Sequence, residues 1–249
     1  MEHSGLEELT ALQGLAGVTA AILAGGLGTR LRSVVADRPK VLAEVRGRPF
    51  LAFLLDQLAD AGVRYVVLCT GYLGEQVQID FGESYGSLRL VYSQESMPLG
   101  TAGALQLALP LFKSNTVLVM NGDSFCDEDL KEFLAWHFAK KAEATLLLTK
   151  LLNTAEYGRV NLNTNGLVLR FDEKSGNREP GWISAGIYLI NHQLLLTISD
   201  SGFVSLERDI FPTWIGQGLY GYKSQARFLD IGTPETYAVA ENFFTEEKL

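Results

Sequence analysis

The sequence is poor in cysteine, in histidine and in positive charge. Its two cysteines, Cys69 and Cys126, are too few for a metal cage and do not form a Cys-x-x-Cys pair, so we expect a reducing, cytoplasmic setting. His137 and His192 stand at no metal-ligand spacing, and structural roles are expected for both. The net charge of -8 argues against general binding of nucleic acid, because an acidic surface repels a phosphate backbone.

Long hydrophobic runs are also absent. No apolar stretch approaches the roughly 20 residues of a membrane-spanning helix, so we expect no partnership with a membrane. Residues 1–17 are acidic and lack a basic segment followed by an apolar one, which argues against a signal peptide. We interpret them as a short helical extension before the first strand.

The chain instead alternates apolar runs with amphipathic segments, which indicates an α/β fold. The runs are apolar on both faces, as is typical of parallel strands, and they predict strands at 18–24, 63–70, 88–93, 116–123 and 144–150. Helical spacing predicts helices at 48–62, 100–112 and 127–141. A ligand cleft is expected at the strand ends, where ligands collect in open α/β sheets.

After residue 150 the pattern becomes mixed. Asn165-Gly166 predicts a hairpin turn, because both residues accept positive φ. The remaining predictions are a buried strand at 182–190, a helix at 205–218, a short antiparallel pair within 219–235, and a final helix at 234–244.

The stretch LAGGLGTRLRS, residues 23–33, follows the first predicted strand. Glycines without Cβ let backbone N–H groups approach an anion, and Arg30 offers a bidentate grip. Neither G-x-G-x-x-G nor G-x-x-x-x-G-K-[ST] can be written on it, which excludes two familiar nucleotide loops. On the glycines alone, a tight turn and a phosphate cradle remain equally acceptable.

Extended to Lys40, this stretch resembles the L-A-G-G-x-G-T-R-L…P-K motif of the sugar-1-phosphate nucleotidyltransferases. The resemblance continues to about residue 245, through PLGTAGAL (98–105), NGDS (121–124), EYGRV (156–160), FDEK (171–174), SAGIYLI (184–190), SLERDIFP (205–212) and FLDIGTPE (228–235). It implies a Rossmann-like three-layer sandwich with a mostly parallel, mixed central sheet. Residues 18–249 would form one domain, with a nucleotide-binding half at 18–125 and a sugar-binding half at 126–249.

The resemblance also implies the reaction. A sugar 1-phosphate attacks the α-phosphorus of a nucleoside triphosphate, and pyrophosphate leaves. Arg30 would lie on the side of the pyrophosphate and Lys40 would contact the α-phosphate. Asp123 and Asp230 each end an apolar run, and carboxylates at two strand ends suit Mg²⁺, the expected cofactor. These four residues are the expected catalytic residues, and no side-chain nucleophile is required.

The implied binding residues fall into two sets. The expected nucleotide contacts are Leu23, Ala24, Gly25, Gly26, Gly28, Thr29, Arg30, Glu95, Gly100, Thr101 and Ala102. The expected contacts with the sugar phosphate are Asp123, Tyr157, Gly158, Glu173, Lys174, Ser184, Gly186 and Glu207. An exposed ion-pair face on a helix is an equally open interpretation of Glu207.

Several alternatives stay open. The sequence LRSVV, where many relatives have L-x-P-L-T, together with NGDSF and FLDIGTPE, most resembles the branch of the family that joins D-glycero-D-manno-heptose 1-phosphate to GTP. A carboxylate at Glu95 suits the N–H donors of guanine, but uracil and thymine also present one. Mannose 1-phosphate with GTP, a uridylyl- or thymidylyltransferase, and a non-catalytic regulator that binds nucleotide sugars are the other candidates. A homo-oligomer is left open.

Overall fold

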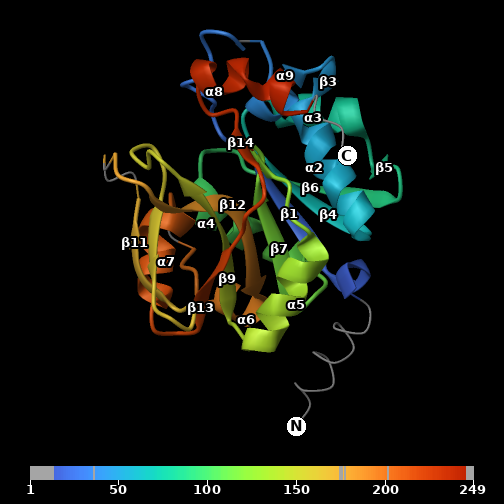
Figure 1. Cartoon of the computed structure of the whole chain (residues 1–249). Coiled ribbons are helices and arrows are strands. Elements are labelled where there is room, and N and C mark those ends of the chain that lie inside the picture. Colours follow the sequence, from blue (N-terminus) through green and yellow to red (C-terminus); the bar gives the residue numbers. More distant parts are fainter. Residues whose placement is uncertain (1–13, 36, 174–175, 177, 201, 245–249) are drawn as a thin grey trace.

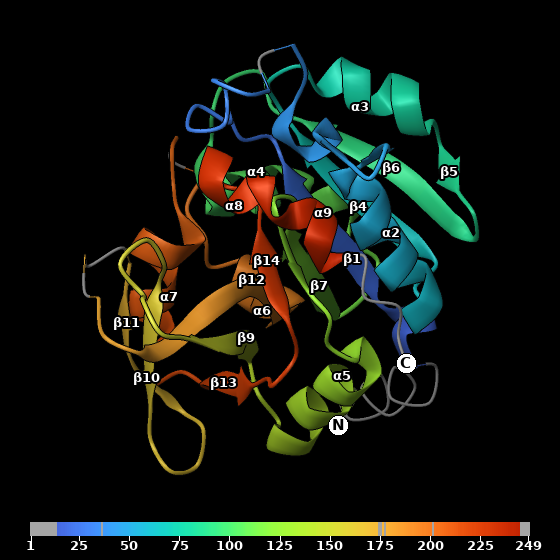
Figure 2. The same cartoon turned by 45° about the horizontal axis from the view of Figure 1, so that its top comes forward.

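A central sheet of ten strands organises the chain in the computed structural model, which describes residues 14–35, 37–173, 176, 178–200 and 202–244. Its main path runs β11-β10-β12-β7-β1-β4-β6-β5, with β9 joined to β12 and β13 joined to β9. In both cartoon views β5 and β11 lie at opposite sides of the molecule (Figures 1 and 2). The strands are β1 (Thr19–Ala24), β4 (Tyr65–Thr70), β5 (Ser84–Tyr85), β6 (Leu88–Gln94), β7 (Thr116–Asn121), β9 (Ala144–Leu151), β10 (Arg159–Leu162), β11 (Val168–Asp172), β12 (Gly181–Asn191) and β13 (Leu219–Lys223).

The parallel core of the sheet agrees with the sequence. Strand β1 lies parallel to β4 and β7, and β4 lies parallel to β6. The prediction of a parallel neighbourhood for 144–150 was partly wrong, because β9 is antiparallel to β12 and parallel only to β13. Burial on both faces selects apolar residues whatever the direction of the neighbour, so composition could not separate the two cases.

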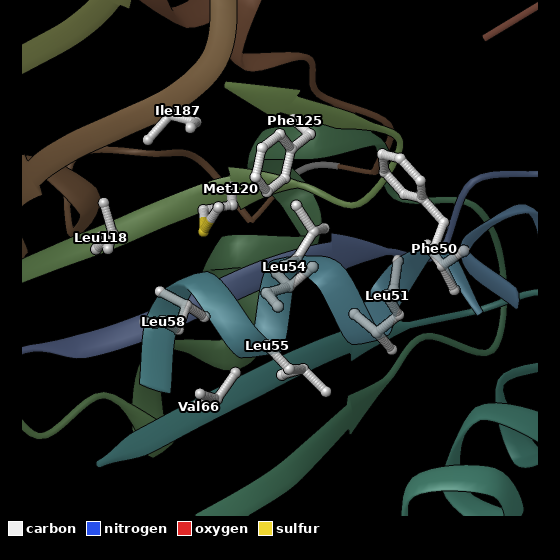
Figure 3. Packing of buried hydrophobic residues seen from close by; sticks show 14 of the residues in the cluster. Phe50, Leu51, Leu54, Leu55, Leu58, Val66, Leu118, Met120, Phe125 and Ile187 are labelled. Carbon is white, nitrogen blue, oxygen red and sulfur yellow. The ribbon is translucent and has the colours of Figure 1, made fainter. Parts of the chain in front are cut away.

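Helices cover both faces of the sheet, which makes three layers. Alternate residues of β1 point to opposite sides: Ala20 and Ile22 belong to one buried cluster and Ala21 to the other. Helices α2 (Phe50–Ala61) and α5 (Leu130–Lys140) pack in the first cluster, and α4 (Gly100–Ala108) packs in the second. Figure 3 shows Leu54 of α2 beside Met120 of β7, and both belong to the first cluster. None of the described helices is long and apolar enough to cross a membrane.

The short strands β14 and β8 bring residues 228–230 beside residues 124–126. Strand β14 (Phe228–Asp230) pairs antiparallel with β8 (Ser124–Cys126), and β13 pairs with β9. The predicted antiparallel pair within 219–235 was therefore wrong, since its two halves each pair elsewhere. The consequence is that Asp230 lies opposite Ser124, one residue after Asp123.

The later helices are shorter than predicted. In place of the helix predicted at 205–218, a π-helical turn, Leu206–Ile210, is followed by the short helix α7 (Phe211–Trp214). Pro212 has no N–H, so it cannot donate the hydrogen bond that would continue the π-helical turn. The final helix is divided into α8 (Pro234–Ala238) and α9 (Ala240–Phe243). The helix α3 (Gly74–Phe81) was not foreseen, whereas the hairpin is confirmed, with Gly166 at φ 89° between β10 and β11.

The predicted N-terminal extension lies outside the described residues except for Gly14–Gly17, which form a 3₁₀ turn.

Candidate active site

A cleft of about 420 Å³ opens at the carboxyl ends of β1, β4 and β7. Such strand ends are the usual ligand position in an open α/β sheet. Most of the expected nucleotide contacts line it, together with two expected catalytic residues: Leu23, Ala24, Gly25, Gly26, Gly28, Thr29, Glu95, Gly100, Thr101, Lys40 and Asp123. Arg30 and Ala102 do not line it. Ala102 is fully buried, and its N–H donates to the Val204 carbonyl at 2.9 Å.

The loop after β1 is shaped by Gly28. Its φ of 60° lies in the left-handed region, and its carbonyl accepts from Leu31 N–H at 2.9 Å. A Cβ at this position would come within 3.3 Å of the Lys40 Cβ. The loop is therefore a turn that packs directly against Lys40.

Lys40 and Asp123 form an ion pair in the wall of the cleft. Lys40 Nζ lies 2.6 Å from Asp123 Oδ2, and only 11% of the Lys40 side chain is exposed. Burial disfavours the charged Asp123 carboxylate, but the charge and hydrogen bond of Lys40, with the charge of Arg30, hold its pKa below the usual value. Gly122 N–H donates to the Leu23 carbonyl at 2.9 Å, which fixes this segment to the end of β1, just before the glycine loop.

Asp230 reaches the same region from β14. Ile231 N–H donates to the Asp123 carbonyl at 2.8 Å, so the backbones of the two acidic segments are joined. Asp230 Oδ1 accepts from Gly232 N–H at 2.7 Å, and Oδ2 accepts from the Tyr157 hydroxyl. Burial and this hydrogen bond raise the pKa of Tyr157 above its usual value. The structure thus brings together Asp123, Asp230 and Tyr157.

Arg30 lies at the exposed rim of this region. Its Nη1 is 3.8 Å from Glu156 Oε2, and half of the arginine side chain is exposed. An exposed pair at this distance contributes little to stability. The guanidinium therefore remains available to an anion, while its positive charge is close enough to lower the pKa of Asp123.

Glu95 lies in the wall of the cleft beside α4. Its Oε2 accepts from Leu99 N–H at 3.2 Å, and its own N–H donates to the Thr70 carbonyl at 2.9 Å. Burial raises the pKa of this carboxyl, although the Leu99 hydrogen bond opposes the shift. One carboxylate oxygen thus already has a backbone partner.

Five of the expected sugar contacts lie at or beside strands β10, β11 and β12: Tyr157 and Gly158 precede β10, Glu173 follows β11, and Ser184 and Gly186 belong to β12. Gly158 accepts from Ser184 N–H at 2.9 Å, and a Cβ at Gly158 would come within 2.7 Å of Glu173 Oε2. Gly186 N–H donates to Ser184 Oγ at 3.3 Å. Apart from Asp123, the expected sugar contacts do not line the 420 Å³ cleft in the described part of the chain. Lys174 lies outside the described residues.

Glu207 connects the two halves of the chain. Its carboxylate accepts from Thr101 Oγ1 at 2.8 Å, from Ser205 Oγ at 3.0 Å and from the Tyr188 hydroxyl at 3.1 Å. Thr101 stands at the start of α4 and Tyr188 in β12. These contacts differ from those of an exposed helical ion-pair face, which was the alternative interpretation.

Sequence reasoning missed several residues that line the cleft. Asn121 directly precedes Gly122-Asp123, and its buried Oδ1 has no hydrogen-bond partner in the described structure. Its place in the quoted NGDS stretch was a usable signal. Pro98, Phe203 and Ser205 also line the cleft. Pro98 and Ser205 begin the quoted stretches PLGTAGAL and SLERDIFP, whereas Phe203 lies outside every quoted stretch.

The cleft and its charges are those of a nucleotide-transferring enzyme. Residues 19–247 match the protein family described as Nucleotidyl transferase, and the chain belongs to this family. The chain is 36% identical over 223 residues to D-glycero-alpha-D-manno-heptose 1-phosphate guanylyltransferase of Aneurinibacillus thermoaerophilus. The matched residues cover 89% of this chain and 96% of that protein. Mannose-1-phosphate guanylyltransferase of Mycobacterium tuberculosis is 33% identical over 224 residues, which cover 88% of this chain but only 62% of that protein.

Solved structures give the same result. HddC from Yersinia pseudotuberculosis has a TM-score of 0.82 and 30% identity, covering 91% of this chain and 99% of that chain. The same protein complexed with GMP-PN has a TM-score of 0.80 and 29% identity, with the same coverage of both chains. The expected family, enzyme class and fold are confirmed.

Proposed function

We propose that this enzyme joins D-glycero-D-manno-heptose 1-phosphate to GTP, giving GDP-heptose and pyrophosphate. The observation that carries the proposal is the cleft itself, in which the glycine loop, Lys40 and Asp123 line one cavity at the ends of parallel strands. The similarity to the heptose 1-phosphate guanylyltransferase over 96% of that protein supports the choice of substrates.

The proposed reaction is a direct displacement at phosphorus. An oxygen of the sugar 1-phosphate attacks the α-phosphorus, the bond to the bridging oxygen of the β-phosphate breaks, and pyrophosphate leaves with that electron pair. Lys40 neutralises charge on the α-phosphate, and Arg30 does so on the departing pyrophosphate. Backbone N–H groups of the loop, from Leu23 to Thr29, hold the triphosphate.

The acidic residues fit a divalent cation. No cluster of three His, Cys, Asp or Glu side chains suitable for a metal occurs in the described part of the chain. Mg²⁺ needs only one or two carboxylates when phosphate oxygens and water complete its shell, and Asp123 and Asp230 stand on joined backbone segments. Bound Mg²⁺ would supply positive charge to the phosphates. Lys40 donates a hydrogen bond to Asp123, and the Tyr157 hydroxyl donates one to Asp230.

The remaining roles follow from position. Glu95, with Gly100 and Thr101, is proposed to contact the base, since these residues line the cleft at and beside the start of α4. Ala102 is proposed to support that wall. The proposed sugar-phosphate site comprises Asp123, Tyr157, Gly158, Glu173, Lys174, Ser184, Gly186 and Glu207. Both cysteines are free and buried, which supports the proposed cytoplasmic setting.

A substrate panel tests the proposal. Pyrophosphate release is measured with GTP, ATP, UTP and dTTP, each paired with heptose, mannose and glucose 1-phosphates. Release with GTP and heptose 1-phosphate, at the highest kcat/KM of the panel, is expected. Preference for mannose 1-phosphate would contradict the proposed sugar and favour the activity named for the Mycobacterium relative. Absence of turnover with every pair, beside tight binding of GDP-sugars, would favour a regulatory protein.

A further inference from the structure

The side chain of Phe203 is an exposed aromatic group in the wall of the candidate nucleotide cleft. It is 59% exposed, although it is one of the large hydrophobic residues that proteins usually bury. It lines the same cavity as Glu95 and Gly100 but comes from the second half of the chain. An aromatic ring left exposed in the wall of a ligand cleft indicates a contact with a ligand.

The segment that carries Phe203 is fastened to the start of α4. Val204 N–H donates to the Leu99 carbonyl at 2.8 Å, and the Val204 carbonyl accepts from Ala102 N–H at 2.9 Å. Leu206 N–H donates to Thr101 Oγ1 at 2.8 Å. Phe203 is thereby held beside the wall that contains Gly100, Thr101 and Glu95.

One side of the ring has a partner within the chain. The Arg208 guanidinium carbon lies 5.7 Å from the ring centroid, which is within the range of a cation–π contact. Because more than half of the side chain stays exposed, the ring retains a surface that a planar group can cover. A nucleobase suits it, since every base presents a π face to an aromatic side chain.

We propose that Phe203 stacks on the base of the bound nucleoside triphosphate and so closes one side of the base site. The proposal rests on the proposed function, in that the cleft binds a nucleoside triphosphate with its base beside α4. Stacking accepts any base, so Phe203 contributes affinity, while the choice of base falls to hydrogen-bonding groups such as Glu95.

Binding experiments can separate a base contact from a phosphate contact. Dissociation constants for GTP and for inorganic tripolyphosphate, which has no base, are measured on the full chain by calorimetry. We expect Phe203→Ala to raise the Kd for GTP about tenfold and to leave that for tripolyphosphate within about twofold. Phe203→Tyr should restore GTP binding, because tyrosine keeps the ring. Leu169→Ala is the matched control, since Leu169 is also 59% exposed but does not line the cleft.

The proposal is overturned if Phe203→Ala leaves GTP binding unchanged, if it weakens both ligands equally, or if the wild-type protein binds no nucleoside triphosphate. Kinetics add a second readout: the KM for GTP should rise about tenfold while kcat at saturating GTP stays within about twofold. If the wild type shows no turnover with any sugar 1-phosphate but Phe203→Ala still weakens GTP selectively, the proposed reaction fails and the stacking contact stands.

Discussion

Lys40 and Asp123 pair with each other at 2.6 Å, although each is expected to face the phosphates during the reaction. The pair satisfies the mostly buried Lys40 ammonium and the Asp123 carboxylate, since an unpaired buried charge is costly. Bound substrate phosphates would interact with Lys40, and a bound cation would interact with Asp123. The ion pair and the proposed reaction therefore involve the same two side chains.

Lys40→Ala should lower kcat on the order of 100-fold to 1,000-fold, as expected when one donor to developing charge is removed. The measurement is pyrophosphate release at saturating GTP and heptose 1-phosphate. Lys150→Ala is the control, because Lys150 is an exposed lysine at the end of β9. Turnover of Lys40→Ala within threefold of wild type would refute the catalytic assignment.

Asp230→Asn should raise the Mg²⁺ concentration needed for half-maximal turnover by about tenfold or more, because an amide is a weaker ligand for a hard cation. Its Tyr157 contact can persist, so the fold is expected to remain. Mg²⁺ titrations of activity on Asp230→Asn and on Asp80→Asn, an exposed carboxylate in α3, provide the comparison. Identical titration curves would remove Asp230 from the proposed metal site.

The sequence indicated those parts of the site where a strand end carries a chemically distinctive residue. Asp123 follows the apolar run of β7 and Asp230 ends a run of its own, so both could be singled out. Their proximity was not readable, because β8 and β14 have three residues each and show no periodicity. Phe203 was missed for a related reason. Its place in the cleft follows from backbone hydrogen bonds of Val204 to α4, which leave no local pattern.

His137 should make stability depend on pH. Burial lowers its pKa to about 4 in the folded protein, and Nδ1 lies 2.8 Å from Thr145 Oγ1. An exposed histidine of the unfolded chain titrates near 6.5, so between these values the unfolded chain binds a proton that the folded protein does not. The free energy of unfolding should therefore fall as the pH drops from about 6.5 to about 4, by about 2 kcal/mol at pH 5 relative to pH 7.

Urea unfolding at about pH 5 and about pH 7 measures this effect. His137→Gln cannot be protonated, so its loss of stability between the two pH values should be smaller than that of wild type by about 2 kcal/mol. His192→Gln, at the start of α6 (His192–Leu195), is the control and should keep the wild-type dependence. An equal pH dependence in wild type and His137→Gln would contradict the prediction.

Gly100→Ala should weaken nucleotide binding through the backbone. Gly100 has φ 75°, and a Cβ there would lie 2.4 Å from the Val204 carbonyl oxygen, so the segment carrying Phe203 must shift. We expect a loss of about 1–3 kcal/mol in the free energy of unfolding, from the strained φ and the displaced segment, together with a raised KM for GTP. Gly86→Ala separates the two causes, because Gly86 has φ 53° and open space around the added Cβ. If both variants lose similar stability and only Gly100→Ala binds GTP more weakly, the contact with Val204 is what positions the base wall. Equal KM values for GTP in the two variants would show that this wall tolerates the shift.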